Sequence, residues 1–170
     1  MTALSTGGMI KVIQRGLAGH LTYISATAAW GTNSELTLYP PIAAILVGRE
    51  WDCRCQWSMP RAEQKAGASR TIDFVARRRG KKDWEIGIEV KLLPTRRNGH
   101  EVKVAEDFAK LSEFKESNKR ANTCLLIVGR KREIDHAYVR MGIEKVFLSA
   151  REPVVADLGL TAWGSVAIRP

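Results

Sequence analysis

Three charged residues stand where β-strands are usually apolar: Asp73, Glu89 and Lys91. Asp73 lies within an apolar run, and Glu89 and Lys91 lie within a second one that follows a short basic segment, residues 77–83. This segment contains Gly80 and little apolar surface, so the pattern predicts a β-hairpin joined by a solvated loop. The three charges then belong to adjacent strands.

The register of this hairpin decides whether the charges meet. If Arg78 pairs with Trp84 across the loop, Asp73 lies opposite Glu89, with the roots of the two side chains about 5 Å apart. Side chains alternate between the two faces of a strand, so Lys91 projects from the same face as Glu89. The other face of the second strand is expected to carry Trp84, Ile86, Ile88, Val90 and Leu92.

Two carboxylates and an amine in one place suit the metal-assisted cleavage of a phosphodiester. The carboxylates can hold Mg²⁺ or Mn²⁺, which keeps several waters and binds phosphate oxygens. The ammonium can orient or help deprotonate the attacking water and stabilise the transition state. Glu and Lys alternating with apolar residues are also typical of an ordinary half-exposed strand with weak surface pairs. The surrounding elements must decide between these interpretations.

A helix is expected upstream of the hairpin. Asn33 or Ser34 can cap it, and it begins near Glu35. Its apolar face consists of Leu36, Tyr39, Ile42, Ala43, Ile45 and Leu46. The pair Pro40-Pro41 must break or kink this helix.

The remaining core elements follow in order along the chain. A first strand is expected from Trp51 to about Met59, before the hairpin strand that carries Asp73. After the hairpin, residues 94–99 form a loop, and a helix runs from about 101 to 119. Its buried stripe is Val104, Phe108 and Leu111, with Asp107 and Lys110 on a neighbouring face. A buried strand, residues 123–128, completes the core.

The chain of 170 residues, 45% of them hydrophobic, is expected to form one domain, residues 1–170, with its core at about 35–128. An amphipathic helix is predicted at 8–24. Residues 133–168 are predicted to add a helix at 133–142, a strand at 145–148 and a strand pair or irregular cover at 154–168. No apolar segment approaches the length of a membrane span, so neither export nor membrane insertion is indicated and we expect a cytoplasmic protein.

This order of elements resembles the PD-(D/E)XK nuclease superfamily, which has the restriction-endonuclease-like fold. The resemblance rests on Glu35, on Ile72-Asp73-Phe74 and on Ile88-Glu89-Val90-Lys91, and covers about residues 35–128. It implies an α/β fold: a three-layer α/β/α core with a mixed, mainly four-stranded sheet flanked by helices. Ile72 stands where the family's name has proline, a departure that many members share.

The resemblance also implies site roles. Asp73 and Glu89 are expected to bind Mg²⁺ or Mn²⁺, with Val90 as a further metal contact, and Lys91 is expected to be the catalytic amine. Glu35 is expected to be an extra ligand or an acceptor for a metal-bound water. A carboxylate at a helix start is equally favourable through the helix dipole alone.

The net charge of +9 favours a polyanionic partner, because clustered cations release counterions from phosphates. We expect the partner to be nucleic acid, DNA rather than RNA. An anionic membrane is less favoured as a partner, because no amphipathic anchor for it is identified. The expected contact residues are Arg77, Arg78, Arg79, Lys81, Lys82, Arg96, Arg97 and Lys110. A phosphate-facing or merely solvated position explains Lys110 better than a catalytic one. The pair Cys53 and Cys55 is expected to be reduced core thiols rather than zinc ligands.

Three functions remain open from the sequence. The first is a Mg²⁺-dependent endonuclease or exonuclease, whose cleavage of nucleic acid should be lost when Asp73 or Lys91 is replaced. The second is a nuclease-like module that binds nucleic acid or helps an assembly with weak or no catalysis. The third is a protein-interaction subunit whose basic surface meets an acidic partner. A homodimer or a place in a larger complex is compatible with each, and no interface is readable from the sequence.

Overall fold

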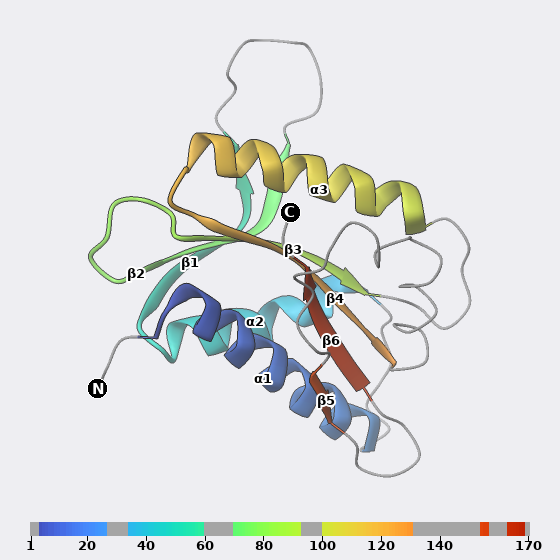
Figure 1. Ribbon diagram of the computed structural model, residues 1–170. Coiled ribbons are helices and arrows are strands. Elements are labelled where there is room, and N and C mark those ends of the chain that lie inside the picture. Colours follow the sequence, from blue (N-terminus) through green and yellow to red (C-terminus); the bar gives the residue numbers. More distant parts are fainter. Residues whose placement is uncertain are drawn as a thin grey trace.

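The computed structural model describes residues 4–26, 34–59, 70–92, 100–130, 154–156 and 163–168, an α/β arrangement with helices on both faces of a mixed sheet (Figure 1). The helices are α1 (Thr6–Ala26), α2 (Tyr39–Val47) and α3 (His100–Ser117), with a 3₁₀ turn, η1 (Glu35–Leu38), directly before α2. The strands are β1 (Trp51–Ser58), β2 (Thr71–Arg78), β3 (Ile86–Leu92), β4 (Asn122–Arg130), β5 (Val154–Ala156) and β6 (Trp163–Ile168).

The sheet has the strand order β1-β2-β3-β4-β6-β5. The pairs β1/β2, β2/β3, β4/β6 and β5/β6 are antiparallel, whereas β3 and β4 are parallel. A parallel pair needs a crossover connection, and α3 lies in it. The predicted four-stranded mixed core is therefore present as β1 to β4. The two short C-terminal strands join the same sheet beside β4, so the sheet is wider than the core that the sequence predicted.

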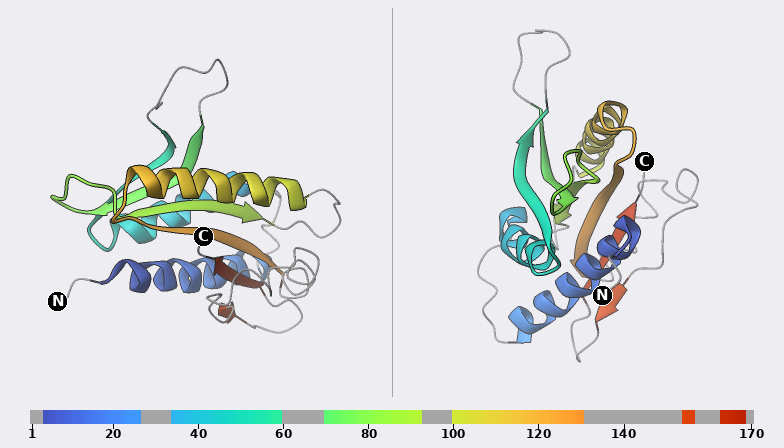
Figure 2. Two further views of the ribbon diagram at one scale, coloured as in Figure 1. Left: turned by 45° about the horizontal axis from the view of Figure 1, so that its top comes forward. Right: turned by 90° about the vertical axis from the view of Figure 1, so that its left-hand side faces the viewer.

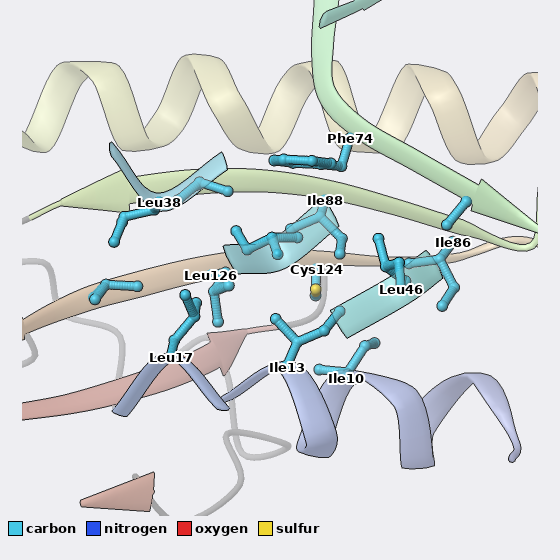
Figure 3. Close-up of a cluster of buried hydrophobic side chains, with 14 of the residues drawn as sticks. Ile10, Ile13, Leu17, Leu38, Leu46, Phe74, Ile86, Ile88, Cys124 and Leu126 are labelled. Atoms are coloured by element: carbon cyan, nitrogen blue, oxygen red, sulfur yellow. The ribbon is translucent and has the colours of Figure 1, made fainter. Parts of the chain in front are cut away.

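The β2/β3 register agrees with the prediction where the strands pair, since Phe74 pairs with Ile88 and Ala76 with Ile86. The predicted pair of Asp73 with Glu89 lies just beyond the paired residues, because the strands separate there. Alternation along β3 is also as expected. Its residues Ile86, Ile88, Val90 and Leu92 pack in the core cluster between the sheet and helices α1 and α2 (Figure 3). Glu89 and Lys91 face α3 on the opposite side, where they form ion pairs with its residues.

The predicted position of Trp84 is wrong. Trp84 precedes β3 rather than belonging to it, so strand alternation does not determine where its side chain points. It packs instead on the α3 side of the sheet, with its ring centroid 6.2 Å from that of Trp57. The second core cluster, on this α3 side, is built around Ile72, Val75, Leu111, Phe114, Ala121, Leu125 and Ile127.

At one place, the side chains of β1 and β2 change the face of the sheet to which they point. Ile72 and Phe74 are two residues apart, yet they pack in opposite core clusters. Cys55 pairs with Phe74 and Trp57 with Ile72, so Gln56 lies opposite Asp73, and its φ of 48° is in the left-handed region. A regular strand keeps residues two apart on one face, so the twist at this pair re-aims Asp73. The ends of β1 and β2 beyond it curve away from the sheet (Figure 2).

The segment before β1 differs from the helix predicted to begin near Glu35. Ser34 does cap the segment, accepting a hydrogen bond from the N–H of Leu36 at 3.3 Å, but the turn that follows is the short 3₁₀ helix η1. The α-helix begins at Tyr39. Pro40 and Pro41 occupy its first positions, where the missing N–H groups need no partner. The prolines therefore start α2 and do not break it.

The other helices match their predictions closely. The N-terminal helix predicted at 8–24 is α1, and the one predicted at 101–119 is α3. The C-terminal strand pair predicted within 154–168 is β5 and β6. The loop at 94–99, the helix at 133–142 and the strand at 145–148 lie outside the described residues. No helix in the described ranges is long and apolar enough to cross a membrane.

Candidate active site

The candidate site lies where β2 separates from β3. The paired residues of these strands reach as far as Phe74 and Ile88. Beyond them the N–H of Val90 donates to Asp73 Oδ2 at 2.8 Å, and the N–H of Leu92 donates to Glu35 Oε1 at 3.3 Å. Two carboxylates thus accept from backbone donors that continued pairing of β2 with β3 would have engaged. This places Asp73 and Glu35 side by side along one edge of β3.

Tyr39 fixes the other oxygen of Asp73. Its hydroxyl donates to Asp73 Oδ1 at 2.5 Å, and its ring packs against the edge of Phe74 at 4.8 Å between centroids. Burial and the hydrogen bond to Asp73 raise the pKa of Tyr39 well above its usual value, so the hydroxyl remains a donor. The sequence pattern placed Tyr39 on the apolar face of the helix and missed this contact. The sequence feature that could have indicated this contact is the place of Tyr39 near a helix start, four residues after Glu35.

The carbonyl of Val90 faces the same edge of β3. The N–H and C=O of one strand residue point to the same neighbouring strand, and the Val90 N–H points to Asp73. The Val90 carbonyl is therefore directed to the side from which β2 has departed. This orientation would make the Val90 carbonyl a further oxygen donor near Asp73, and the metal contact expected of Val90 stays a prediction.

Glu89 is buried on the α3 side of β3, with 2% of its surface exposed. Its Oε2 lies 2.9 Å from Nζ of Lys110, and its Oε1 has no hydrogen-bond partner among the described residues. Burial and the charge of Asp73 raise the pKa of Glu89 to about 8, against the opposing effect of Lys110. One carboxyl oxygen of Glu89 is thus buried at the site without a hydrogen-bond partner among the described residues.

Lys91 lies between two carboxylates. Its Nζ is 2.9 Å from Asp107 Oδ2 and 3.5 Å from Glu35 Oε1. Burial lowers the pKa of Lys91, but the contact with Asp107 and the charges of Asp107 and Glu35 outweigh burial and raise it above its usual value. Lys91 is therefore held as an ammonium in this arrangement.

Lys110 also lies inside the site. Its Nζ is 2.8 Å from Asp107 Oδ1 in addition to the contact with Glu89, and 23% of its side chain is exposed. These contacts raise the pKa of Lys110 although burial opposes them. Lys110 is therefore not merely solvated, because it pairs with two carboxylates of the site, and its expected contact with a phosphate stays a prediction.

The structure brings all four sequence-predicted catalytic residues together: Glu35, Asp73, Glu89 and Lys91. Three residues join them: Tyr39 from α2, and Asp107 and Lys110 from α3. With four ionised carboxylates and two protonated amines the site has a formal charge of −2, a state that it reaches once Glu89 loses its proton above its pKa of about 8. One divalent cation would balance this charge.

The basic residues at 77–82 lie at the other end of the β2/β3 hairpin from Asp73. Arg79 follows Asp73 by six residues along this extended chain, a span of about 20 Å. The guanidinium of Arg78 is paired with Glu85, whose Oε2 also accepts the Arg78 N–H at 2.8 Å. The hydrogen bond with Arg78 holds the pKa of Glu85 below its usual value.

The neighbours of Arg78 are only partly engaged. Arg77 donates to the Lys82 carbonyl at 2.6 Å and stacks 4.7 Å above the Trp84 ring. Lys81 and Lys82 are exposed. Of the predicted nucleic-acid contacts at this loop, these two lysines are the most available. Arg96 and Arg97 lie outside the described residues.

The described part of the chain bears on the expectations for metal ligands and for the cysteines Cys53 and Cys55. Within it, no group of three or more His, Cys, Asp or Glu side chains is arranged to hold a metal ion. Cys53 is half-buried against the core, but Cys55 is exposed, so the expectation of two core thiols is wrong for Cys55. Two carboxylates are sufficient for Mg²⁺ when waters and substrate phosphates supply the other ligands.

Comparison of the chain with known proteins does not name a family. A scan against models of protein families finds no match, a search of curated proteins finds no similar protein, and a search of solved structures finds no similar structure. The functional argument therefore depends on the site geometry.

Proposed function

We propose that this protein is a metal-dependent nuclease of the PD-(D/E)XK type that hydrolyses phosphodiester bonds in DNA, by endonucleolytic cleavage. The observation that carries the proposal is the gathering of carboxylates where β2 leaves β3: Asp73 and Glu35 accept from the edge of β3, and Lys91 lies against Glu35. Glu89 lies on the same strand, and one of its buried oxygens lacks a partner among the described residues. The mixed sheet between helices is compatible with the restriction-endonuclease-like fold.

The residues present fit a hard divalent cation. Asp73, Glu89 and the Val90 carbonyl offer only oxygen donors, which suit Mg²⁺ or Mn²⁺. Oε1 of Glu89 has no partner among the described residues, and the site has a formal charge of −2 once Glu89 is ionised; both support the same conclusion. Such an ion, when bound, supplies Lewis-acid stabilisation of the charge that develops on the phosphate.

Lys91 and Glu35 are the side chains that would act on the attacking water and on the phosphate. The Lys91 ammonium can orient the attacking water and stabilise negative charge at the phosphorus. Glu35 remains 39% exposed while its Oε1 contacts Lys91 and the Leu92 N–H, so its carboxylate can also accept a hydrogen bond from a water at the site. Tyr39 holds the Asp73 carboxylate in its orientation.

The positive charge of the protein supports a polyanionic substrate. The chain carries a net charge of +9, and Lys81 and Lys82 are exposed on the loop between β2 and β3. Such cations bind phosphates through counterion release and without reading bases. They would hold the nucleic-acid backbone at a distance from the reacting phosphate, since the loop lies about 20 Å along the hairpin from Asp73.

A nuclease-like module that binds nucleic acid with weak or no catalysis is the second candidate. The ion pair between Lys110 and Glu89 favours it, because an ammonium already lies against one oxygen of a proposed metal ligand. A stable pair of this kind would compete with a divalent cation for Glu89.

Cleavage assays separate the two candidates. The purified protein is incubated with supercoiled, linear and single-stranded DNA, and with RNA, in Mg²⁺, Mn²⁺ or EDTA. We expect cleavage of DNA that requires the metal and falls at least about 100-fold in Asp73→Ala and Lys91→Ala. The matched controls are Asp83→Ala and Lys119→Ala, which remove the same charges from exposed positions and should leave cleavage intact.

Binding measurements complete the test. If the wild type binds DNA in a salt-dependent manner but cuts none of the substrates with either metal, the catalytic proposal is wrong and the second candidate stands. If Asp73→Ala retains full activity while folded by circular dichroism, this site is not the one that cleaves.

A further inference from the structure

Asp107 contacts both amines of the candidate site. Its Oδ2 lies 2.9 Å from Nζ of Lys91, and its Oδ1 lies 2.8 Å from Nζ of Lys110. Only 8% of its side chain is exposed. A carboxylate so deeply buried remains charged only where cations pair with it, and here each oxygen has one.

The two lysines need such a partner to have a fixed position. A lysine ammonium is a point charge at the end of a flexible four-carbon chain, so the backbone of β3 alone does not determine where the Lys91 amine lies. Glu35 contacts the same amine from 3.5 Å and is 39% exposed. Asp107 is both closer and more deeply buried, so it makes the stronger contact.

The place of Asp107 on α3 allows it to reach both amines of the site. Asp107 and Lys110 are three residues apart, on one face of the helix, and that face lies against β3. Gly87 on β3 permits the close approach of α3, since a Cβ there would come within 2.7 Å of the Phe114 ring. One helical turn therefore brings a carboxylate and an amine to Lys91 and Glu89.

We propose that Asp107 is a positioning residue of the site: it holds the Lys91 ammonium in its place beside Glu35, and it holds Lys110 against Glu89. The catalytic consequence rests on the proposed nuclease function. The positioning itself is a property of the protein without substrate, and it can be measured separately.

The decisive variant is Asp107→Asn, which keeps the size of the side chain and removes its charge. The matched control is Glu106→Gln, which removes one negative charge from the adjacent, exposed position of α3. Circular dichroism and thermal unfolding establish that each variant is folded.

The first readout is independent of catalysis. In the wild type, nuclear magnetic resonance of the lysine amines should show the Lys91 and Lys110 ammonium groups in slow exchange with water, and both should resist an amine-acylating reagent. Asp107→Asn should lose both forms of protection, and Glu106→Gln should keep them. Rapid exchange of both amines in the wild type would overturn the proposal, and this measurement requires no variant to fold.

The second readout is kinetic. We expect kcat for DNA cleavage to fall about 10- to 100-fold in Asp107→Asn, with KM for DNA unchanged because the buried carboxylate does not face the substrate. A merely structural role would lower the unfolding temperature and leave kcat unchanged, and that result would overturn the proposal. If the wild type shows protected amines but no cleavage, the nuclease function fails and the positioning of the amines by Asp107 stands.

Discussion

The hydroxyl of Tyr39 donates a hydrogen bond to Asp73 Oδ1, while Asp73 Oδ2 accepts the N–H of Val90. One carboxylate therefore joins the start of α2 to β3 at the point where β2 departs. Asp73 has this position because the side chains of β1 and β2 change the face to which they point at Gln56 and Asp73. The geometry of the candidate site depends on this connection, and it suggests the first experiment.

Tyr39→Phe removes the hydroxyl and keeps the ring packed against Phe74. A hydrogen bond to a charged group contributes about 1.5–3 kcal/mol, so we expect the free energy of unfolding to fall by about that amount. A double-mutant cycle with Asp73→Ala, measured by denaturant unfolding, should give a coupling energy of at least about 1 kcal/mol. Additive effects of the two substitutions would show that the two side chains do not interact.

Glu89 should make stability fall as pH rises. Its pKa is about 8 in the folded protein and 4.5 in the reference state, so between these values the native state binds the proton that the unfolded state has lost. The contribution of Glu89 is thus intact below about pH 4.5 and is lost as pH passes 8, a change of a few kcal/mol.

Glu89→Gln tests this directly, because glutamine is neutral at every pH. Denaturant unfolding between pH 5 and pH 9 should give a flatter dependence of the unfolding free energy on pH in the variant than in the wild type. An equal slope in both proteins would mean that Glu89 titrates near its ordinary value.

Added metal should stabilise the folded protein if Asp73 and Glu89 bind it. A ligand that binds only the native state raises the unfolding temperature by mass action, and carboxylate ligands must be deprotonated to bind. We expect Mg²⁺ or Mn²⁺ to raise the unfolding temperature more at pH 8.5 than at pH 6, and Asp73→Asn to abolish the rise. A rise of the same size in Asp73→Asn would place the metal elsewhere.

The exposed lysines of the β2/β3 loop should contribute to DNA affinity more than Arg78 does. Replacing Lys81 and Lys82 together by alanine should weaken binding to all sequences and reduce the slope of log K against log salt by about 2. Arg78→Ala should instead lower the unfolding temperature, because its guanidinium is paired with Glu85. A larger loss of affinity in Arg78→Ala than in the double variant would reverse this assignment.

Gly87 should not tolerate a side chain. A Cβ at this position would lie 2.7 Å from ring atoms of Phe114, so Gly87→Ala must displace the Phe114 ring or α3 and should cost about 1–3 kcal/mol. Gly19 is the matched control, since a Cβ there meets nothing within 4 Å and alanine is the better helix former. Thermal unfolding should show a lower midpoint for Gly87→Ala and an equal or higher one for Gly19→Ala.

Several features of the fold were readable from local pattern. Alternating apolar residues predicted the strand that became β3, and the basic segment with Gly80 predicted the loop between β2 and β3. The hairpin register followed from pairing across that loop and is confirmed at Phe74 and Ile88. The place of Trp84 was wrong, because alternation does not extend past the end of a strand.

The sequence by itself determined that Asp73, Glu89 and Lys91 lie on adjacent strands, since strand periodicity and loop chemistry are local properties of the chain. Only the tertiary structure decided which other groups surround them. Tyr39 and Asp107 are separated from their partners by long stretches of chain, and no local period encodes such contacts. The docking of α2 and α3 against the sheet brings them in, and the departure of β2 from β3 leaves the backbone donors that Asp73 and Glu35 satisfy.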